Sequence, residues 1–526
     1  MTNVKEEVNK AFQETFKIIF GECNLELDEL KEYLVSQHYM PLSIKKSKVS
    51  GKEVFLCNNK YSKDSNFISQ DELSLQKPEP LDINQIKDLD SIIESLRENF
   101  NYCGNKLFGR CANIERCDNC TDSINLYNCH TILNSKNLAY CEYVRDNSEN
   151  AFGSAHFLRG RFLLRFIGGD NSSRCFETST AVNCSDIYFS YQCINCSETM
   201  FSFNVRSKKY CIGNTALERD KYLSIKKKLL AEMREYIEKH KRFYSIYDFS
   251  QKFDSIVQKP HVPKIPEEPF DILPVQKAFE TTTKVILAKA LGKMQNYEKF
   301  LQKRPDIVKH SKSIFGNTLY YSDYFRTGFI PKERLINADE IDYAGAAKVQ
   351  IEPDDDLNSI LKKASSIAFY SPELKEGNNH NNRETPIIYN GSDGYKMGDI
   401  THSKKCAYCT HASKCEAVFG SSMLINSSKY CLRCHDSNKL TACMDCDSCS
   451  NCSYCYFCHN CEGLTECMFC FNTKSLRYAI GNVEVGKEKY MKIKKMVCDE
   501  IIKRLERDGD IGFDIYNIRC YKNNHF

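Results

Sequence analysis

Cysteines recur at intervals of three residues, and this spacing restricts the fold more than any other feature of the sequence. Side chains three apart point to opposite faces of a strand, and on an α-helix each step of three residues slips by about 60°. Neither element therefore gathers such a run on one face. A coil whose length is a multiple of three residues does, as in parallel β-helices with hexapeptide or nonapeptide repeats. The longest run is Cys443, Cys446, Cys449, Cys452, Cys455, Cys458 and Cys461.

The thiol is small and apolar enough to fill a narrow interior. Cys175, Cys184 and Cys193 keep the same spacing in an earlier block. We therefore expect these three and the seven cysteines of the long run to form the core of a β-solenoid. A polyproline-II bundle also has three residues per turn, but the chain has only 13 Pro.

The two cysteine-rich blocks are copies of each other. Residues 200–227 and 468–495 align without a gap at an offset of 268 and are identical at 14 of 28 positions. The same offset pairs Cys141 with Cys409 and Cys175 with Cys443. This predicts an internal duplication of about 90 residues. Such a repeat largely determines the fold.

A long amphipathic helix is expected after each block, and it would cover the open end of the coils. Thr215 to Glu218 fits a capping box at the start of the first of these helices. The predicted fold class is α+β: two duplicated Cys-lined parallel β-solenoids, each capped by a helix, plus a mixed middle region. The predicted segments are an N-terminal helical segment (1–40), a linker with a short helix (41–100), solenoid 1 (101–214), capping helix 1 (215–260), a Cys-free middle region (261–400), solenoid 2 (401–482), and capping helix 2 with a tail (483–526).

The N-terminus lacks the apolar core of a secretion signal, and no apolar run approaches the roughly 20 residues needed to span a bilayer. We therefore expect a cytoplasmic protein, or one inside an intracellularly assembled particle, with no membrane partner. Thiols stay mostly reduced there, so the 29 Cys are interpreted as core thiols or metal ligands. The formal net charge of +4 is too small to indicate nucleic acid by itself.

Zinc sites commonly use two Cys-x-x-Cys pairs separated by a loop. Cys406 and Cys409 with Cys431 and Cys434 have such a separation, and Cys117 with Cys120 is a further pair. These six cysteines are candidate zinc ligands. The alternative is that they are structural thiols stacked in the solenoids.

Lysines gather on the two expected capping helices. They are candidates for phosphate contacts, although Glu232, Glu235 and Glu238 interleave with bases in the first helix and favour a solvated face. No nucleophile and base stand in a recognisable motif, so no catalytic residue is assigned. The candidate phosphate contacts are Lys226, Lys227, Lys228, Lys494 and Lys495.

Both blocks lead into Phe-x-Phe-Asn (201–204 and 469–472), then Tyr-x-Ile-x-Asn (210–214 and 478–482), and then a helix rich in Lys, Glu and Tyr. In these residues the chain resembles a group of uncharacterised, zinc-ribbon-like, cysteine-rich repeat proteins predicted in uncultured small-genome bacteria. The resemblance covers 139–228 and 407–496 and implies a cysteine-rich repeat protein of unassigned function, without catalytic residues to carry over. Those proteins have one such block, and their N-terminal cysteine pairs have no counterpart in 1–100, where Cys23 and Cys57 stand alone.

Three functions compete at this point. The first is a non-enzymatic structural or interaction protein, whose solenoids present flat surfaces to a protein partner or to another copy, as in a large particle. The second is a zinc-dependent nucleic-acid-binding protein that uses the Cys-x-x-Cys pairs and the basic helices. The third is an acyltransferase-like solenoid enzyme. No small-molecule substrate is evident from the sequence.

Overall fold

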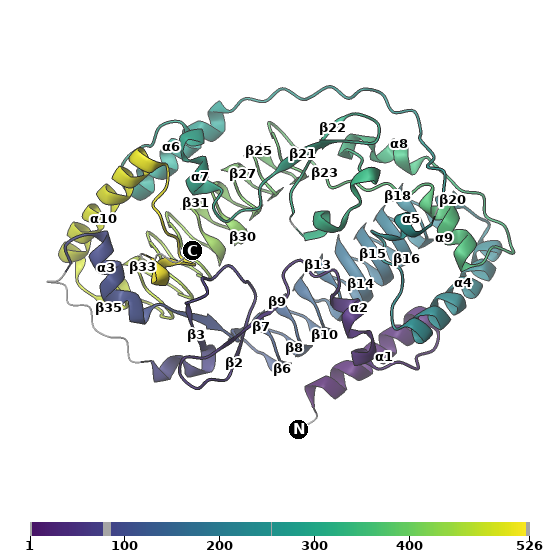
Figure 1. Ribbon diagram of the computed structural model, residues 1–526, viewed down its shortest axis with the longest axis horizontal. Coiled ribbons are helices and arrows are strands. Elements are labelled where there is room, and N and C mark those ends of the chain that lie inside the picture. Colours follow the sequence, from purple (N-terminus) through teal and green to yellow (C-terminus); the bar gives the residue numbers. More distant parts are fainter. Residues whose placement is uncertain (1–2, 77–85, 254, 324, 522–526) are drawn as a thin grey trace.

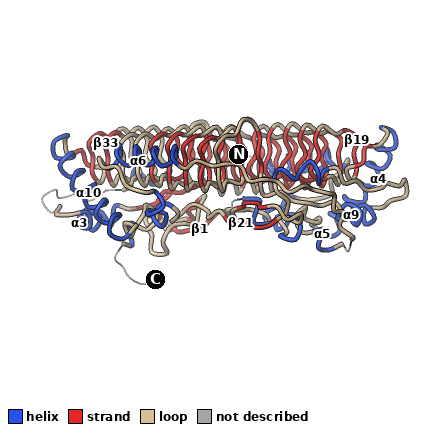
Figure 2. Tube along the Cα trace, turned by 90° about the horizontal axis from the view of Figure 1, so that it is seen from above, coloured by secondary structure: helices blue, strands red, loops and turns tan. Residues whose placement is uncertain are grey.

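The computed structural model describes residues 3–76, 86–253, 255–323 and 325–521 (Figure 1). Helices and many strands are both present, which confirms the α+β class. Parallel strands are stacked in each half of the chain, in separate sheets, and helices lie at the two outer ends of the molecule (Figure 1 and Figure 2). We call residues 107–216 the first coil stack and residues 374–484 the second coil stack.

Most coils of a stack have 12 residues. Arg161 pairs with Ser173, and Ser173 pairs with Ser185, in parallel register. Some coils hold one extra residue, so that Lys136 pairs with Glu149. A 12-residue coil is thus four triplets long, and every third side chain points inside. This explains why the cysteines are spaced by three residues.

The residue before each inward cysteine has a left-handed backbone conformation. Asp445, Ser448 and Asn451 have φ values of 53°, 54° and 52°. Side chains other than Gly rarely adopt this region, but Asn and Asp tolerate it. Asn is frequent at these positions and also links neighbouring coils, since the Asn113 amide donates to Asn125 Oδ1 at 3.1 Å.

Inward Ser and Cys side chains supply hydrogen-bond acceptors to the backbone as well as filling the interior. The backbone N–H of Cys449 donates to Ser437 Oγ one coil earlier, at 2.9 Å. In the first stack the N–H of Cys129 donates to Cys117 Sγ at 3.2 Å. A buried backbone N–H requires an acceptor, and both Ser and Cys supply one. This explains why Ser and Cys exchange at equivalent inward positions.

The ten cysteines expected to form the core lie in the interior, each with 5% or less of its surface exposed. Every cysteine among the described residues is a free thiol. The thiol of Cys449 donates to the carbonyl of Cys458 at 3.4 Å, in the next coil. The interior is therefore a hydrogen-bonded thiol core.

A helix covers one side of each stack. α1 (Val4–Phe20) packs its buried Phe12 and Phe16 on the first stack, and α6 (Leu273–Leu287) packs Phe279 on the second. After the stacks come α4 (Arg219–His240) and α10 (Lys487–Asp508), each of 22 residues. Each lies at the outer end of its own stack (Figure 1 and Figure 2).

Two further segments cross to the opposite stack. The first arm, residues 43–76 and 86–104, places Leu96 and Tyr102 in the core of the second stack. The second arm, residues 309–323 and 325–372, places Ile360 and Tyr370 in the core of the first stack. In Figure 1, α3 of the first arm lies beside α10, and α9 of the second arm lies beside α4. The arms are thus exchanged between the two halves of the chain.

Several segments differ from their expected roles. The region 41–100, expected to be a linker with one helix, contains strands and packs as part of the first arm, although its residues 77–85 lie outside the described part. Parallel pairing in the second stack begins at β23 (Leu374–Glu376), which is inside the expected middle region 261–400. Its early inward side chains are Ile388, Met397 and Ile400 rather than cysteines, so the cysteine spacing could not indicate them.

The strands of the first stack pair in parallel except for a short antiparallel hairpin at the end. They are β5 (Leu107–Phe108), β6 (Ala112–Glu115), β7 (Asp118–Thr121), β8 (Ile124–Tyr127), β9 (His130–Leu133), β10 (Lys136–Ala139), β11 (Glu142–Arg145), β12 (Glu149–Phe152), β13 (Ala155–Leu158), β14 (Arg161–Asp170), β15 (Ser173–Val182), β16 (Ser185–Ile194), β17 (Ser197–Met200), β18 (Phe203–Arg206), β19 (Lys209–Ile212) and β20 (Thr215–Ala216).

The second stack ends in an equivalent hairpin, and between β32 and β33 its coils continue through single parallel bridges such as Met444 with Tyr456. Its strands after β23 are β24 (Ile387–Tyr389), β25 (Ser392–Tyr395), β26 (Asp399–Thr401), β27 (Lys404–Ala407), β28 (His411–Ser413), β29 (Glu416–Phe419), β30 (Ser422–Asn426), β31 (Lys429–Leu432), β32 (His435–Asn438), β33 (Thr465–Met468), β34 (Arg477–Ile480) and β35 (Val483–Glu484).

The remaining strands and α-helices belong to the arms and to the segments beside them. They are α2 (Lys31–Val35), β1 (Ser43–Lys46), β2 (Glu53–Leu56), β3 (Asn66–Ser69), α3 (Leu89–Leu96), β4 (Asn101–Gly104), α5 (Phe249–Lys252), α7 (Glu298–Leu301), β21 (Lys309–Lys312), β22 (Thr318–Tyr321), α8 (Ile341–Gly345) and α9 (Leu357–Ser365).

Candidate functional site

The expected zinc ligands of the second stack are not brought together. Ser421 lies between Cys409 and Cys434: its N–H donates to Cys409 Sγ at 3.4 Å, and its Oγ accepts the N–H of Cys434 at 3.1 Å. The two pairs are therefore two coils apart, or about 9–10 Å. Zinc requires sulfur ligands at about 2.3 Å, so Cys406, Cys409, Cys431 and Cys434 do not form one site.

Cys117 and Cys120 lie inside the first stack, with Cys129 one coil above Cys117. Burial raises the pKa of both thiols, and this disfavours the thiolate that a metal needs. Within the described residues, no three His, Cys, Asp or Glu side chains are arranged to hold a metal ion.

The lysines of the capping helices have different surroundings. Lys226 Nζ pairs with Glu198 at 2.6 Å and Lys494 Nζ pairs with Glu466 at 2.7 Å, so each fastens its helix to the stack. Lys228 Nζ donates to the carbonyls of Asp354 and Asp355. Lys227 and Lys495 are exposed. The structure thus uses three of these five lysines in internal contacts.

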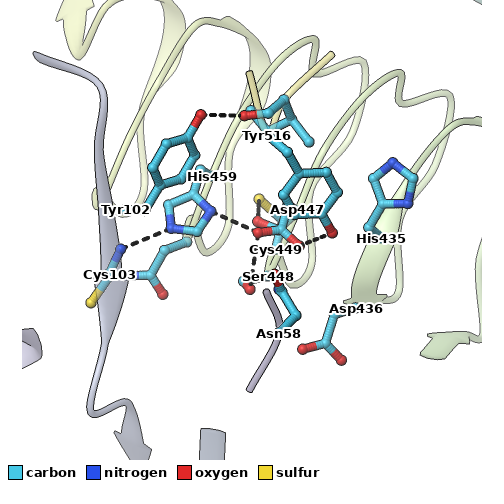
Figure 3. A network of polar contacts seen from close by, with 12 residues as sticks. Asn58, Tyr102, Cys103, His435, Asp436, Asp447, Ser448, Cys449, His459 and Tyr516 are labelled. Carbon is cyan, nitrogen blue, oxygen red and sulfur yellow. Dashed lines mark hydrogen bonds and ion pairs between the residues drawn. The ribbon is translucent and has the colours of Figure 1, made fainter. Parts of the chain in front are cut away.

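A buried polar network joins the first arm to the second stack (Figure 3). Asp447 and His459 lie on adjacent coils, because they pair in the ladder. This places His459 Nδ1 at 2.8 Å from Asp447 Oδ2. Asp447 also accepts hydrogen bonds from Tyr516 at 3.0 Å and from Tyr61 at 3.3 Å. Burial acts to raise the pKa of Asp447, but the hydrogen bond from His459 and its charge outweigh burial and lower it.

The other ring nitrogen of His459 binds the main chain. His459 Nε2 accepts the backbone N–H of Cys103 at 3.0 Å, in strand β4 of the first arm. The two ring nitrogens thus contact two different segments, Asp447 in the neighbouring coil and Cys103 in the first arm. Burial raises the pKa of the Cys103 thiol to about 12. The arrangement therefore positions a strand and does not activate a nucleophile.

Contacts equivalent to this network occur 268 positions earlier. Tyr191 takes the place of His459, and its hydroxyl donates to the carbonyl of Ser371 at 2.6 Å. Ser179 takes the place of Asp447 and accepts the hydroxyl of Tyr247 at 2.7 Å. The first stack thus binds the second arm with uncharged groups where the second stack uses a histidine and a carboxylate.

His435 and Lys60 lie close to the network. The backbone N–H of Ser422 donates to His435 Nδ1 at 3.2 Å, and Ser422 Oγ lies 2.8 Å from the same nitrogen. His435 Nε2 has no hydrogen-bond partner among the described residues. Burial and the charge of Lys60 lower the pKa of His435 to about 3. Burial also lowers the pKa of Lys60 to about 8. His435 directly follows the Cys431–Cys434 pair, and alignment at the 268 offset shows that it faces Ile167; no local motif marks Lys60.

A cavity of about 720 Å³ lies at the first coil of the second stack, between the second arm and the connector 265–268. Its charged groups are already paired in part: Lys375 with Asp339 at 3.0 Å and Arg383 with Glu267 at 3.1 Å. Glu373, on its wall, is buried, and burial raises its pKa to about 7. Its carboxylate accepts the backbone N–H groups of Tyr320 and Ala338, which ties together parts of the second arm.

Comparison with protein-family models, with curated proteins and with solved structures finds no match to this chain. The resemblance to cysteine-rich repeat proteins therefore stays a prediction. Over the described ranges, no helix has the length and apolar character needed to cross a membrane.

Proposed function

We propose that the chain is a non-enzymatic scaffold. In this proposal, two duplicated Cys-lined β-solenoids, each capped by a helix, present long regular faces to a protein partner or to another copy of the chain. The observation that carries the proposal is the parallel, in-register stacking of strands within each coil stack. Such a stack offers repeated, evenly spaced side chains, which suits assembly.

Contacts that repeat at the 268 offset support the duplication. Arg165 pairs with Glu177 at 2.7 Å, and Arg433 pairs with Asp445 at 2.7 Å; both arginines are buried. Each guanidinium also lies over an aromatic ring, at 4.2 Å from Tyr33 and 4.3 Å from Phe300. The helices α4 and α10 begin and end at positions 268 apart. The matching helix ends, at His240 and Asp508, support a repeat that continues past residues 228 and 496.

One outward column has the same pattern on both stacks. A base, three hydroxyl residues and a second base follow one another, with about 4.8 Å between neighbouring coils. These side chains are exposed or half-buried, and they form the surface that we assign to assembly. The columns are Arg161, Ser173, Ser185, Ser197 and Lys209 in the first stack, and Lys429, Thr441, Ser453, Thr465 and Arg477 in the second.

Sedimentation velocity over a wide concentration range tests the proposal. We expect species larger than the 60.8 kDa chain to increase with concentration. The double variant Ser185→Arg/Ser453→Arg adds a charge at the centre of both columns and should reduce association. Gln295→Arg adds the same charge at an exposed position elsewhere and should not. A wild-type chain that stays monomeric throughout would contradict the self-assembly form of the proposal, and failure to bind any protein as well would contradict the whole.

A further inference from the structure

The first coil of the second stack has a free edge. At its junction with the second coil, the N–H of Asp393 donates to the carbonyl of His380 at 3.0 Å, and the N–H of His380 donates to the carbonyl of Gly391 at 3.2 Å. Other junctions of the stack repeat this pair of hydrogen bonds. β23, at the start of the first coil, is the last strand of its sheet and pairs on one side only, with β24. The opposite edge of the first coil therefore lacks a neighbouring coil.

Four main-chain groups on this edge form no hydrogen bond within the described part of the chain. Two are N–H groups of left-handed residues, with φ of 52° at Asn381 and 51° at Glu384, like Asp393 (54°) one coil later. The other two are the carbonyls of Asn379 and Asn382, whose side-chain oxygens accept N–H groups of the second coil at 3.1 and 2.9 Å. Unpaired donors and acceptors in this order form a template for a further strand.

The free edge opens onto the cavity of about 720 Å³ at the first coil. Asn379, Asn382 and Glu384 line the cavity from the coil, and the second arm and the connector 265–268 form its other walls. The volume lies in the range of about 300–1,000 Å³ that is usual for ligand sites. Tyr343 of the second arm also lines the cavity, and its side chain is 41% exposed. The cavity thus combines unpaired main-chain groups with an uncovered aromatic ring.

The charges on the cavity walls favour a basic ligand. Both cations that line the cavity, Lys375 and Arg383, are already paired with carboxylates, at 3.0 and 3.1 Å. Two further wall carboxylates, Glu268 and Glu384, form no ion pair within the described ranges. An incoming Lys or Arg side chain therefore gains a partner, whereas an acidic side chain is repelled.

We propose that the first coil of the second stack binds an extended segment of a partner protein, rich in Lys or Arg, as an added strand. Main-chain hydrogen bonds to the N–H groups of Asn381 and Glu384 and to the two free carbonyls hold the segment, and its alternate side chains reach the carboxylates and Tyr343. This site goes beyond the proposed scaffold function and lies apart from the outward columns. The Ser185→Arg/Ser453→Arg variant should therefore bind the segment as the wild type does.

Fluorescence anisotropy with the full-length chain and a labelled Lys-Val-Lys-Val-Lys-Val peptide tests the proposal. One control peptide, Glu-Val-Glu-Val-Glu-Val, reverses the charge. A second control is the basic peptide with every amide N-methylated, which keeps the charge but removes the N–H donors. We expect each control to bind at least about tenfold more weakly than the basic peptide. No binding of the basic peptide, or a control that binds equally well, would overturn the proposal.

Two double variants with the same change in net charge locate the binding. Glu268→Gln/Glu384→Gln removes the unpaired carboxylates of the cavity and should weaken binding of the basic peptide about threefold to tenfold. Glu235→Gln/Glu488→Gln removes two exposed carboxylates on α4 and α10 and should change the affinity by less than about twofold. Equal weakening in both double variants would show that the peptide responds to overall charge, and would contradict the proposed site.

Hydrogen exchange of the full-length chain, with and without saturating basic peptide, reports the added strand itself. The N–H groups of Asn381 and Glu384 gain acceptors, so they should exchange at least about tenfold more slowly when the peptide is bound. Residues 449–452, in the middle of the same stack, provide the internal control and should not change. Binding that leaves exchange in residues 378–385 unaltered would also overturn the proposal.

Discussion

Replacement of one inward serine should show why cysteine and serine line the coils. Ser437 is 3% exposed, and its Oγ accepts the N–H of Cys449 at 2.9 Å while it donates to the carbonyl of His435 at 2.6 Å. Ser437→Ala removes the acceptor and leaves the N–H of Cys449 buried without a partner. An unsatisfied buried donor costs about 1–3 kcal/mol of unfolding free energy.

Ser437→Cys should behave differently, because the first stack already contains this pairing. There, Cys117 Sγ accepts the N–H of Cys129 at 3.2 Å. The cysteine variant keeps an acceptor at the inward position, so we expect a loss below about 1 kcal/mol. Ser450→Ala, on the outward side of the same stack, serves as the control and should change stability by about 0.5 kcal/mol or less.

Urea unfolding followed by far-UV circular dichroism gives the free energies, and hydrogen exchange at Cys449 reports the local effect. The expected order of stability is wild type, then Ser437→Cys, then Ser437→Ala. If the cysteine and alanine variants lose equal stability, small size rather than the acceptor atom explains the inward residues. If Ser437→Ala matches Ser450→Ala, the N–H of Cys449 has another partner and the reasoning is wrong.

Four other outcomes follow from the structure. Proteolysis within the exposed connector 255–272, where Ile256 is 92% exposed, should leave both fragments in one particle on gel filtration, because each arm stays docked on the opposite stack; separation of the fragments would contradict the exchange. Arg433→Met should cost about 3–5 kcal/mol, since it leaves Asp445 buried without its partner, and Arg433→Met/Asp445→Leu should recover part of this loss in the same urea assay. Burial raises the pKa of Glu373 from 4.5 to about 7, so the folded chain holds this proton more tightly than the unfolded chain; stability should therefore fall as pH rises from 4.5 to 7, and Glu373→Gln should flatten that decline in thermal unfolding. Metal analysis of the purified chain should find well below one zinc per chain, because Ser421 separates the two cysteine pairs; stoichiometric zinc would contradict this.

The spacing of inward residues could be predicted from the sequence because each coil is built from triplets. Thiols at every third position, together with the 268 offset, indicated both the interior and the repeat. A second indication was available: Asn or Asp often precedes an inward cysteine, as at Asn183 and Asp445, where the backbone is left-handed. The coil length could not be derived, since any multiple of three fits the spacing.

The exchange of the arms could not be predicted, because its contacts join residues without a shared motif. The side chain of Asn472 binds the main-chain carbonyl of Asn101, and the side chain of His459 binds the main-chain N–H of Cys103. Every residue type except Pro has both main-chain groups, so the sequence does not indicate these contacts. The candidate zinc pairs failed for a related reason. Spacing along the chain suggested that Cys409 and Cys434 could meet, but the winding of the coils places Ser421 between them.

The exchanged arms also affect how the chain is made. Asn101 binds a partner 371 positions further along the chain. At a synthesis rate of about 5–20 residues per second, the ribosome needs roughly 20–70 s to produce that partner. During this time the apolar side chains with which the first arm packs on the second stack, such as Leu96 and Tyr102, lack that part of their final surroundings. The first arm therefore reaches its final packing only after the second half of the chain has been made.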